Sequence, residues 1–170
     1  DKNLGPEIVR QIEKAIFACG CFWGVQHQME RAQGVVSSTV GYTGGKEQHP
    51  TYQEVKAHST GHAEAVLVEY DAEQTTYKEL CKLFFEIHDP AQTDGQGPDI
   101  GPQYRSEIFY LNEAQKAEAE AIIQLLREKG YQVNTRLTPA SEFWPAEDYH
   151  QHYYDKTGGE PYCHIRIKKF

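Results

Sequence analysis

Residues 14 to 24 read Lys14-Ala-Ile-Phe-Ala-Cys-Gly-Cys-Phe-Trp-Gly24, and this stretch decides how the predicted fold begins. Its apolar run ends at a glycine, which is typical of a buried strand followed by a turn. A helix is predicted over residues 22 to 33, because Val25, Met29 and Ala32 fall on one face and Gly34 follows as a C-terminal cap. The sequence therefore predicts a strand, a tight turn and a helix.

The rest of the chain extends this pattern. Strand character is present at residues 35–42, 63–70 and 106–111, and apolar residues have helical spacing over 77–88. Asn112, with Gln115 three residues later, predicts the start of an alanine-rich helix that ends at Gly130. The order is that of a ferredoxin-like split βαβ sandwich. We therefore predict an α+β fold with helices on one face of the sheet, an extra helix and an irregular C-terminal segment.

Composition limits the partners of the chain. Its 170 residues fit one domain, and a formal net charge of -8 at pH 7 argues against nucleic acid as the main partner. No run approaches the roughly 20 apolar residues of a membrane span, so no membrane partner is expected. We expect a monomer in the cytoplasm, although a chain that begins at Asp1 without a methionine also fits a trimmed, exported form.

The four cysteines favour a role in reactivity over a role as a disulfide framework. Cys19, Cys21, Cys81 and Cys163 are too few for a disulfide framework, and their spacing lacks the paired CxxC pattern of a zinc site. We therefore expect no metal and no organic cofactor. Redox or nucleophilic chemistry at a cysteine is the better interpretation.

Cys21 is the candidate nucleophile because it lies between the predicted strand and the predicted helix. Backbone N–H groups at a helix N-terminus favour negative charge, and this position lowers the pKa of a thiol. Phe22 and Trp23 follow directly and offer aromatic faces that accommodate an S-methyl group. The alternative is that Cys21 is a small buried apolar residue and that the two aromatic residues belong to the core.

Six motifs in order resemble those of the A-class methionine sulfoxide reductases. They are Gly20-Cys21-Phe22-Trp23-Gly24, Gly41-Tyr42-Thr43-Gly44-Gly45, Pro50-Thr51-Tyr52, Gly61-His62-Ala63-Glu64-Ala65-Val66, Gln103-Tyr104-Arg105-Ser106 and Pro145-Ala146-Glu147-Asp148-Tyr149-His150-Gln151. Together they cover residues 14–154, which we take as the catalytic domain. An N-terminal extension at 1–13 precedes it, and a C-terminal segment at 155–170 follows.

The resemblance implies thiol-dependent reduction of methionine (S)-sulfoxide, in proteins or as the free amino acid, with Cys21 as nucleophile. Phe22 and Trp23 would bind the substrate methyl group. Glu64 would be the acid, and by strand alternation it shares a face with Val66 and Val68, where burial raises the pKa of a carboxyl.

Other roles also come from the resemblance. Tyr52 and Tyr104 correspond to the tyrosines that hold the sulfoxide oxygen, and a phenol can donate a hydrogen bond without ionising at neutral pH. Asp99 matches an acidic position that supports the pocket. His62 would be a neighbour of Glu64 that shapes the site.

Recycling of the nucleophile needs a second thiol. Attack leaves a sulfenic acid on Cys21, which a thiol can capture as a disulfide. Cys163 is our candidate, because the family often places its recycling cysteine in a C-terminal segment and residues 156–161 are rich in glycine and polar residues. The resemblance implies thioredoxin as the final reductant. We interpret Cys19 and Cys81 as structural.

Two other classes of function stay open at this level. A hydrolase could pair Cys21 with His62, and a metal site could use the same two residues with His58. A thiol redox sensor on the same fold would oxidise Cys21 without turning over a sulfoxide. A disulfide between Cys21 and Cys163 would fit both the sensor and the reductase.

Overall fold

In the computed structural model, which describes residues 11–58, 60–92, 95–96, 98–159, 164 and 166–170, a six-stranded sheet lies at the centre. Its strands are ordered β7-β6-β1-β3-β2-β8. They span Ile12–Cys19 (β1), Val35–Thr43 (β2), Ala63–Asp71 (β3), Ser106–Tyr110 (β6), Arg136–Pro139 (β7) and Trp144–Pro145 (β8). Neighbouring strands are antiparallel except β6 and β7, which are parallel. A separate pair consists of β4 (Gly95–Gln96) and β5 (Asp99–Ile100).

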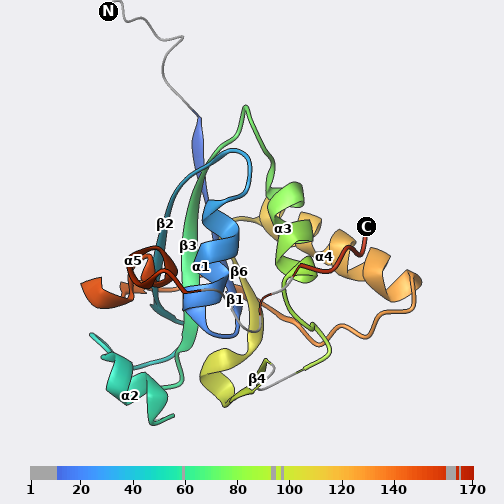
Figure 1. Ribbon diagram of the computed structural model, residues 1–170. Coiled ribbons are helices and arrows are strands. Elements are labelled where there is room, and N and C mark those ends of the chain that lie inside the picture. Colours follow the sequence, from blue (N-terminus) through green and yellow to red (C-terminus); the bar gives the residue numbers. More distant parts are fainter. Residues whose placement is uncertain (1–10, 59, 93–94, 97, 160–163, 165) are drawn as a thin grey trace, which may run out of the picture.

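Three longer helices pack on one face of the sheet; in Figure 1, α1 lies in front of the strands, and α3 and α4 lie to their right. They are α1 (Phe22–Glu30), α3 (Tyr77–Glu86) and α4 (Glu113–Glu128). The main core forms between them and the strand residues on that face, including Phe17, Val66 and Val68. The opposite face carries a smaller cluster around Ile16 and Phe109, covered by residues 140 and 143.

The predicted ferredoxin-like order is confirmed. Strands β6-β1-β3-β2 are adjacent and antiparallel, with α1 and α3 as the two crossover helices. The predicted helix start at Asn112 is also present, because its side chain accepts a hydrogen bond of 2.9 Å from the Gln115 N–H. Gly130 follows α4 with a φ of 96°, a conformation that suits glycine.

Several elements differ from the predicted ones. Helix α1 ends at Glu30, three residues before the predicted end, because turns at residues 29–35 lead directly into β2. The connection before β3 contains a short helix, α2 (Tyr52–Lys56), which begins at a capping box between Thr51 and Glu54. The region after α4, predicted to be irregular, supplies edge strands β7 and β8 and helix α5 (Tyr153–Thr157). Two 3₁₀ turns, η2 (Pro102–Tyr104) and η3 (Asp148–His150), complete the fold.

Within the described residues, no helix is both long enough and apolar enough to cross a membrane.

Candidate active site

The turn from β1 into α1 places Cys21 at the N-cap of the helix. Gly20 has a φ of 108°, which strains any residue with a side chain, and a Cβ there would lie 3.0 Å from the Gln96 side chain. The Cys21 carbonyl accepts the N–H groups of Gly24 and Val25, and the residue is only 8% exposed. The thiol therefore sits at the positive end of α1, inside the protein and close to its surface.

Glu64 reaches the same turn from β3. Its Oε1 accepts a hydrogen bond of 3.2 Å from the N–H of Phe22, the residue directly after Cys21. The side chain is 1% exposed, as the strand alternation predicts. Burial raises the pKa of this carboxyl to about 8, with the charge of Asp99 adding to the rise and the Phe22 N–H opposing it. Glu64 therefore keeps its proton at neutral pH and can donate it.

Two tyrosines lie around the carboxyl, Tyr52 at the start of α2 and Tyr104 at the end of η2. Burial raises the pKa of Tyr52 to about 12, and the charges of Glu64 and Cys21 add to the rise. The pKa of Tyr104 is raised by burial and then by Glu64, Tyr52 and Cys21. This mutual influence indicates that both phenols, the carboxyl and the thiol share one site. Both phenols are neutral hydrogen-bond donors at physiological pH.

An aromatic wall continues from Cys21 along α1. Phe22 is fully buried, and its ring centroid lies 5.2 Å from that of His150 and 6.5 Å from that of Tyr52. Trp23 stacks on Tyr153 at 3.8 Å, and its Nε1–H donates to His150 Nδ1 at 2.9 Å. The Trp23 ring is only partly buried and can present an apolar, polarisable face to a substrate, whereas the Phe22 ring belongs to the core.

The Glu147 carboxylate holds Tyr42 and Tyr52 in position. Its two carboxylate oxygens accept hydrogen bonds from the Tyr42 hydroxyl at 2.8 Å and from the Tyr52 N–H at 3.0 Å. Burial alone would raise the pKa of Glu147, but the Tyr52 N–H and the Tyr42 hydroxyl outweigh it, and the pKa is lowered. Glu147 is therefore a charged anchor for the start of α2. The sequence analysis quoted its motif but gave the residue no role.

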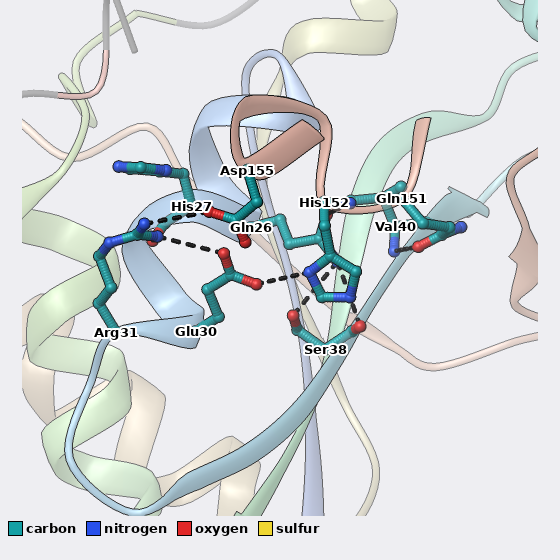
Figure 2. Close-up of polar contacts among 9 residues, drawn as sticks. All are labelled: Gln26, His27, Glu30, Arg31, Ser38, Val40, Gln151, His152 and Asp155. Atoms are coloured by element: carbon teal, nitrogen blue, oxygen red, sulfur yellow. Dashed lines mark hydrogen bonds and ion pairs between the residues drawn. The ribbon is translucent and has the colours of Figure 1, made fainter. Parts of the chain in front are cut away.

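The segment that carries His150 is itself fixed to α1 and β2, as Figure 2 shows. The Gln151 side chain bonds both the N–H and the carbonyl of Val40 at 2.9 Å. The His152 N–H donates to Gln26 Oε1 at 2.6 Å, and its ring contacts Glu30 Oε2 at 2.6 Å. No local pattern predicts these contacts, because they join residues more than 100 positions apart.

Asp99 and His62 occupy supporting positions. Asp99 lies in β5, half-buried, and its charge helps to raise the pKa of Glu64. His62 Nδ1 accepts the Gly45 N–H at 3.0 Å, so Nε2 carries the proton and donates to the Glu47 carbonyl at 2.6 Å. Both ring nitrogens are thus engaged in holding a loop, which leaves His62 unsuited to act as the base for Cys21 in a hydrolase.

The other cysteines fall into two groups. Cys19 and Cys81 are fully buried in the core, and burial raises the pKa of the Cys81 thiol strongly. Cys163, the candidate recycling thiol, lies outside the described residues.

A metal-compatible grouping among the described residues brings together His27, Glu30 and Asp155. Arg31 donates to both of these carboxylates at 3.1 Å and supplies the positive charge that balances them (Figure 2).

Taken together, a thiol, a carboxyl that keeps its proton and an aromatic wall lie at the start of α1, and two phenols are close enough for the charges of the thiol and the carboxyl to raise their pKa values. Such a set can hold and protonate an oxygen atom while a thiolate attacks the atom that carries it.

Comparisons with known proteins agree on one family. The family model described as peptide methionine sulfoxide reductase matches residues 13–170. The Acinetobacter baumannii (strain AYE) protein named peptide methionine sulfoxide reductase MsrA is 47% identical over 156 residues, which cover 92% of this chain and 90% of the relative. The protein of the same name from Methanosarcina acetivorans is 50% identical over 150 residues, covering 86% and 80%.

Solved structures give the same result. Reduced Mxr1 from Saccharomyces cerevisiae superposes with a TM-score of 0.86 at 33% identity, covering 96% of this chain and 95% of that one. Methionine sulfoxide reductase A of Corynebacterium diphtheriae gives 0.78 at 35% identity, covering 89% and 77%. Mxr1 in complex with Trx2 gives 0.61 at 25% identity, covering 98% and 94%.

Proposed function

The chain belongs to the peptide methionine sulfoxide reductase family and reduces methionine sulfoxide in the manner of MsrA, and on that premise we propose that Cys21 is its nucleophile and Glu64 its proton donor. One observation carries this assignment. The buried Glu64 carboxyl, with a pKa raised to about 8 by burial, bonds the N–H of the residue directly after Cys21. A neutral acid thus lies beside a thiol at a helix start.

In the first step, the Cys21 thiolate attacks the sulfoxide. The sulfoxide oxygen leaves the methionine sulfur and becomes bonded to Cys21, while the proton of Glu64 goes to that oxygen. The products are methionine and a sulfenic acid on Cys21. The two-electron reduction of the methionine sulfur is balanced by oxidation of the cysteine sulfur.

Tyr52 and Tyr104 donate hydrogen bonds to the sulfoxide oxygen as negative charge develops on it. Their raised pKa values keep both hydroxyls protonated throughout the pH range in which Glu64 is an acid. Trp23 accepts the S-methyl group on its face, and Phe22 belongs to the core against which Trp23 packs. Asp99 favours the neutral form of Glu64 through its charge, and His62 keeps the adjacent loop in place.

Recycling follows in two balanced steps. The Cys163 thiol attacks the sulfenic acid, which forms the Cys21–Cys163 disulfide and releases water. A dithiol then reduces that disulfide by exchange and becomes a disulfide itself. We assign this role to thioredoxin, a choice that the Mxr1 structure in complex with Trx2 supports.

Finer features of the protein follow from the same family relationship. We propose that it acts on the S epimer, in oxidised proteins and as free methionine sulfoxide, and that it works as a monomer in the cytoplasm. The catalytic domain spans 14–154, with an extension at 1–13 and the recycling segment at 155–170.

The test is turnover of the separate S and R epimers of a methionine sulfoxide peptide with dithiothreitol, using wild type, Cys21→Ser and Cys163→Ser. We expect consumption of the S epimer alone, loss of turnover in Cys21→Ser, and retained turnover in Cys163→Ser because dithiothreitol replaces the internal thiol. Equal rates for Cys21→Ser and wild type would remove Cys21 from the mechanism.

A further inference from the structure

The end of the chain is anchored to α3 by a buried glutamate. Glu86 is 2% exposed, and its Oε1 accepts hydrogen bonds from Arg166 at 2.9 and 2.8 Å. Its Oε2 accepts the Lys169 N–H at 2.9 Å, and its backbone carbonyl accepts the Ile167 N–H at 2.7 Å. In Figure 1 the C-terminus accordingly lies against α3 and α4. The side chain and the backbone carbonyl of Glu86 therefore hold residues 166–169 in place.

Further contacts extend this anchor to the last residue. Lys169 Nζ donates to the carbonyl of Phe85 at 2.6 Å, and the Phe170 ring lies 5.6 Å from the ammonium groups of both Lys82 and Lys129. Cation–π contacts of this kind hold an aromatic ring on the surface. The terminus is thus bound over several residues, unlike most chain ends.

His164 docks separately, against the start of α1. The ring is 1% exposed, and its Nε2–H donates to the Cys19 carbonyl at 2.8 Å. The His164 carbonyl accepts from Gln28 Nε2 at 2.6 Å. A Cβ at Gly24 would lie 2.3 Å from His164 Nδ1, and a Cβ at Gly20 would lie 3.1 Å from Nε2. The imidazole therefore fills a notch that two glycines create on either side of Cys21.

The chain is also fixed before this point. Gln151 and His152 bind β2 and α1, and Asp155 of α5 pairs with Arg31 at 3.1 Å (Figure 2). Helix α5 ends at Thr157. The stretch that contains Cys163 is consequently bounded by described contacts on both sides, and the contact nearest to Cys163 in sequence is that of His164.

We propose that His164 is a positioning residue for disulfide formation, and that its docking in the Gly20–Gly24 notch keeps the thiol of Cys163 within reach of Cys21. The proposal rests on the assignment of Cys163 as the recycling thiol. Consecutive Cα atoms are about 3.8 Å apart, so an anchor on residue 164 limits how far residue 163 can move from the notch. The notch, in turn, is formed by Gly20, directly before the nucleophile, and Gly24, three residues after it.

Docking of His164 should raise the effective concentration of the Cys163 thiol at Cys21. A tethered thiol reacts with its partner at a rate set by the length of the free chain between the anchors, and this concentration falls roughly as the −3/2 power of that length or more steeply. The described contacts before Cys163 end at Gly159, and those after His164 begin at Arg166, so loss of the His164 contact lengthens the distance in sequence between neighbouring anchors. We expect disulfide formation to slow by about tenfold in a variant without this contact, because a longer tether lowers the effective concentration of the thiol at Cys21.

A purely structural role for His164 would have different consequences. Loss of packing at the start of α1 would disturb Cys21 itself and slow sulfoxide reduction as well. A positioning role slows only the second step. The two steps are separable, since methionine release and loss of the first thiol report the first step, whereas loss of a second thiol reports the disulfide step.

The experiment follows both steps in a single turnover of the full chain without added reductant, in wild type, His164→Ala, His164→Gln and Cys163→Ser. His164→Ala should release methionine at a rate within about twofold of wild type and form the disulfide about tenfold more slowly. His164→Gln should recover much of the loss, because its amide N–H can replace Nε2–H as donor to the Cys19 carbonyl. Wild-type disulfide kinetics in His164→Ala, or equal slowing of both steps, would overturn the proposal.

Gly24→Ala provides a second variant that leaves the tail untouched. Its methyl group occupies the position of the His164 ring, while alanine favours the helix by about 1 kcal/mol. It should slow the disulfide step as His164→Ala does, and the double variant should be no slower than either one. Additive slowing would argue against a shared notch. Undiminished disulfide formation in Cys163→Ser would instead remove the proposed recycling thiol and leave the docking of His164 as a separate fact.

Discussion

Two regions of this protein each bury a cysteine and a glutamate, yet their chemistry differs. At the start of α1 they are Cys21 and Glu64, and in α3 they are Cys81 and Glu86. Cys81 lies inside its helix, where burial raises the pKa of the thiol. Cys21 lies at an N-cap, where the helix favours the thiolate. Position along a helix, and not burial alone, therefore distinguishes a candidate nucleophile from a core residue.

The two glutamates show that hydrogen-bond partners, as well as burial, determine the pKa of a carboxyl. Burial raises the pKa of Glu64 to about 8, and the hydrogen bond from the Phe22 N–H opposes this rise without cancelling it. Burial also opposes ionisation of Glu86, but the Lys169 N–H and Arg166 outweigh it and lower its pKa. The first carboxyl is a proton donor and the second is a charged anchor. The C-terminal segment makes the difference, because it supplies both the Lys169 N–H and the Arg166 guanidinium to Glu86.

The largest change in the rate of methionine release is expected on substitution of Glu64. Glu64→Gln removes the transferable proton, so the single-turnover rate of methionine release should fall by about 10²–10⁴-fold. Glu86→Gln, the matched control in α3, should leave this rate within about twofold, because the described side-chain hydrogen bonds of Glu86 go to Arg166 and Lys169. Rapid-quench measurement on both variants checks the difference. A similar loss of the methionine-release rate in both variants would mean that each glutamate acts through folding, which would contradict a specific role of Glu64 as the acid.

The next effect concerns the phenols. Tyr52→Phe and Tyr104→Phe should each lower kcat by about 10²-fold, the usual loss for one donor to a developing oxyanion. Tyr77, a buried tyrosine of α3 near Cys81, is the control, and Tyr77→Phe should leave kcat unchanged. Steady-state kinetics with dithiothreitol provide the measurement. A loss in Tyr77→Phe as large as those in the site variants would contradict the assignment of oxygen donors.

A smaller effect tests the anchor. Arg166→Ala leaves the buried Glu86 carboxylate without its guanidinium, and we expect the free energy of unfolding to fall by about 1–2 kcal/mol, since Arg166 is half-exposed. Arg31→Ala breaks an exposed pair with Asp155 and should cost less than about 0.5 kcal/mol. Urea denaturation at pH 7 compares them. Equal losses of unfolding free energy in the two variants would mean that the burial of Glu86 does not strengthen its pair with Arg166.

The smallest effect is expected at Cys81. Cys81→Ala removes a sulfur from a packed helix, so the free energy of unfolding should fall by about 1 kcal/mol and turnover should stay at the wild-type value. Thermal unfolding and the dithiothreitol assay test this together. A loss of turnover would contradict the structural role of this thiol.

Periodicity was sufficient to predict the sheet core and the face of Glu64, because alternation and helical spacing are local patterns. The Thr51-x-x-Glu54 pattern that begins α2 is also a local signal of a helix start. Glu147, His150 and His164 could not be assigned in the same way. Their partners, such as Tyr42 and Tyr52 for Glu147, lie 95 or more residues away, and no local pattern encodes such a pairing.

The edge strands were missed for a related reason. β7 has four residues and ends at Pro139, and β8 has two, so neither is long enough to show alternation. They form only because β6 and β2 offer unpaired edges to them. Tertiary pairing, in place of local preference, produces these elements.

The most direct test of the central claim is the pH dependence of methionine release in a single turnover, for wild type and Glu64→Gln. Glu64 donates a proton only while it is neutral, so the wild-type rate should fall as the pH rises through about 8, the pKa of the buried carboxyl. The Glu64→Gln rate should be low and lack this fall. A wild-type rate that keeps rising above pH 9, or an equal fall in both proteins, would contradict Glu64 as the acid.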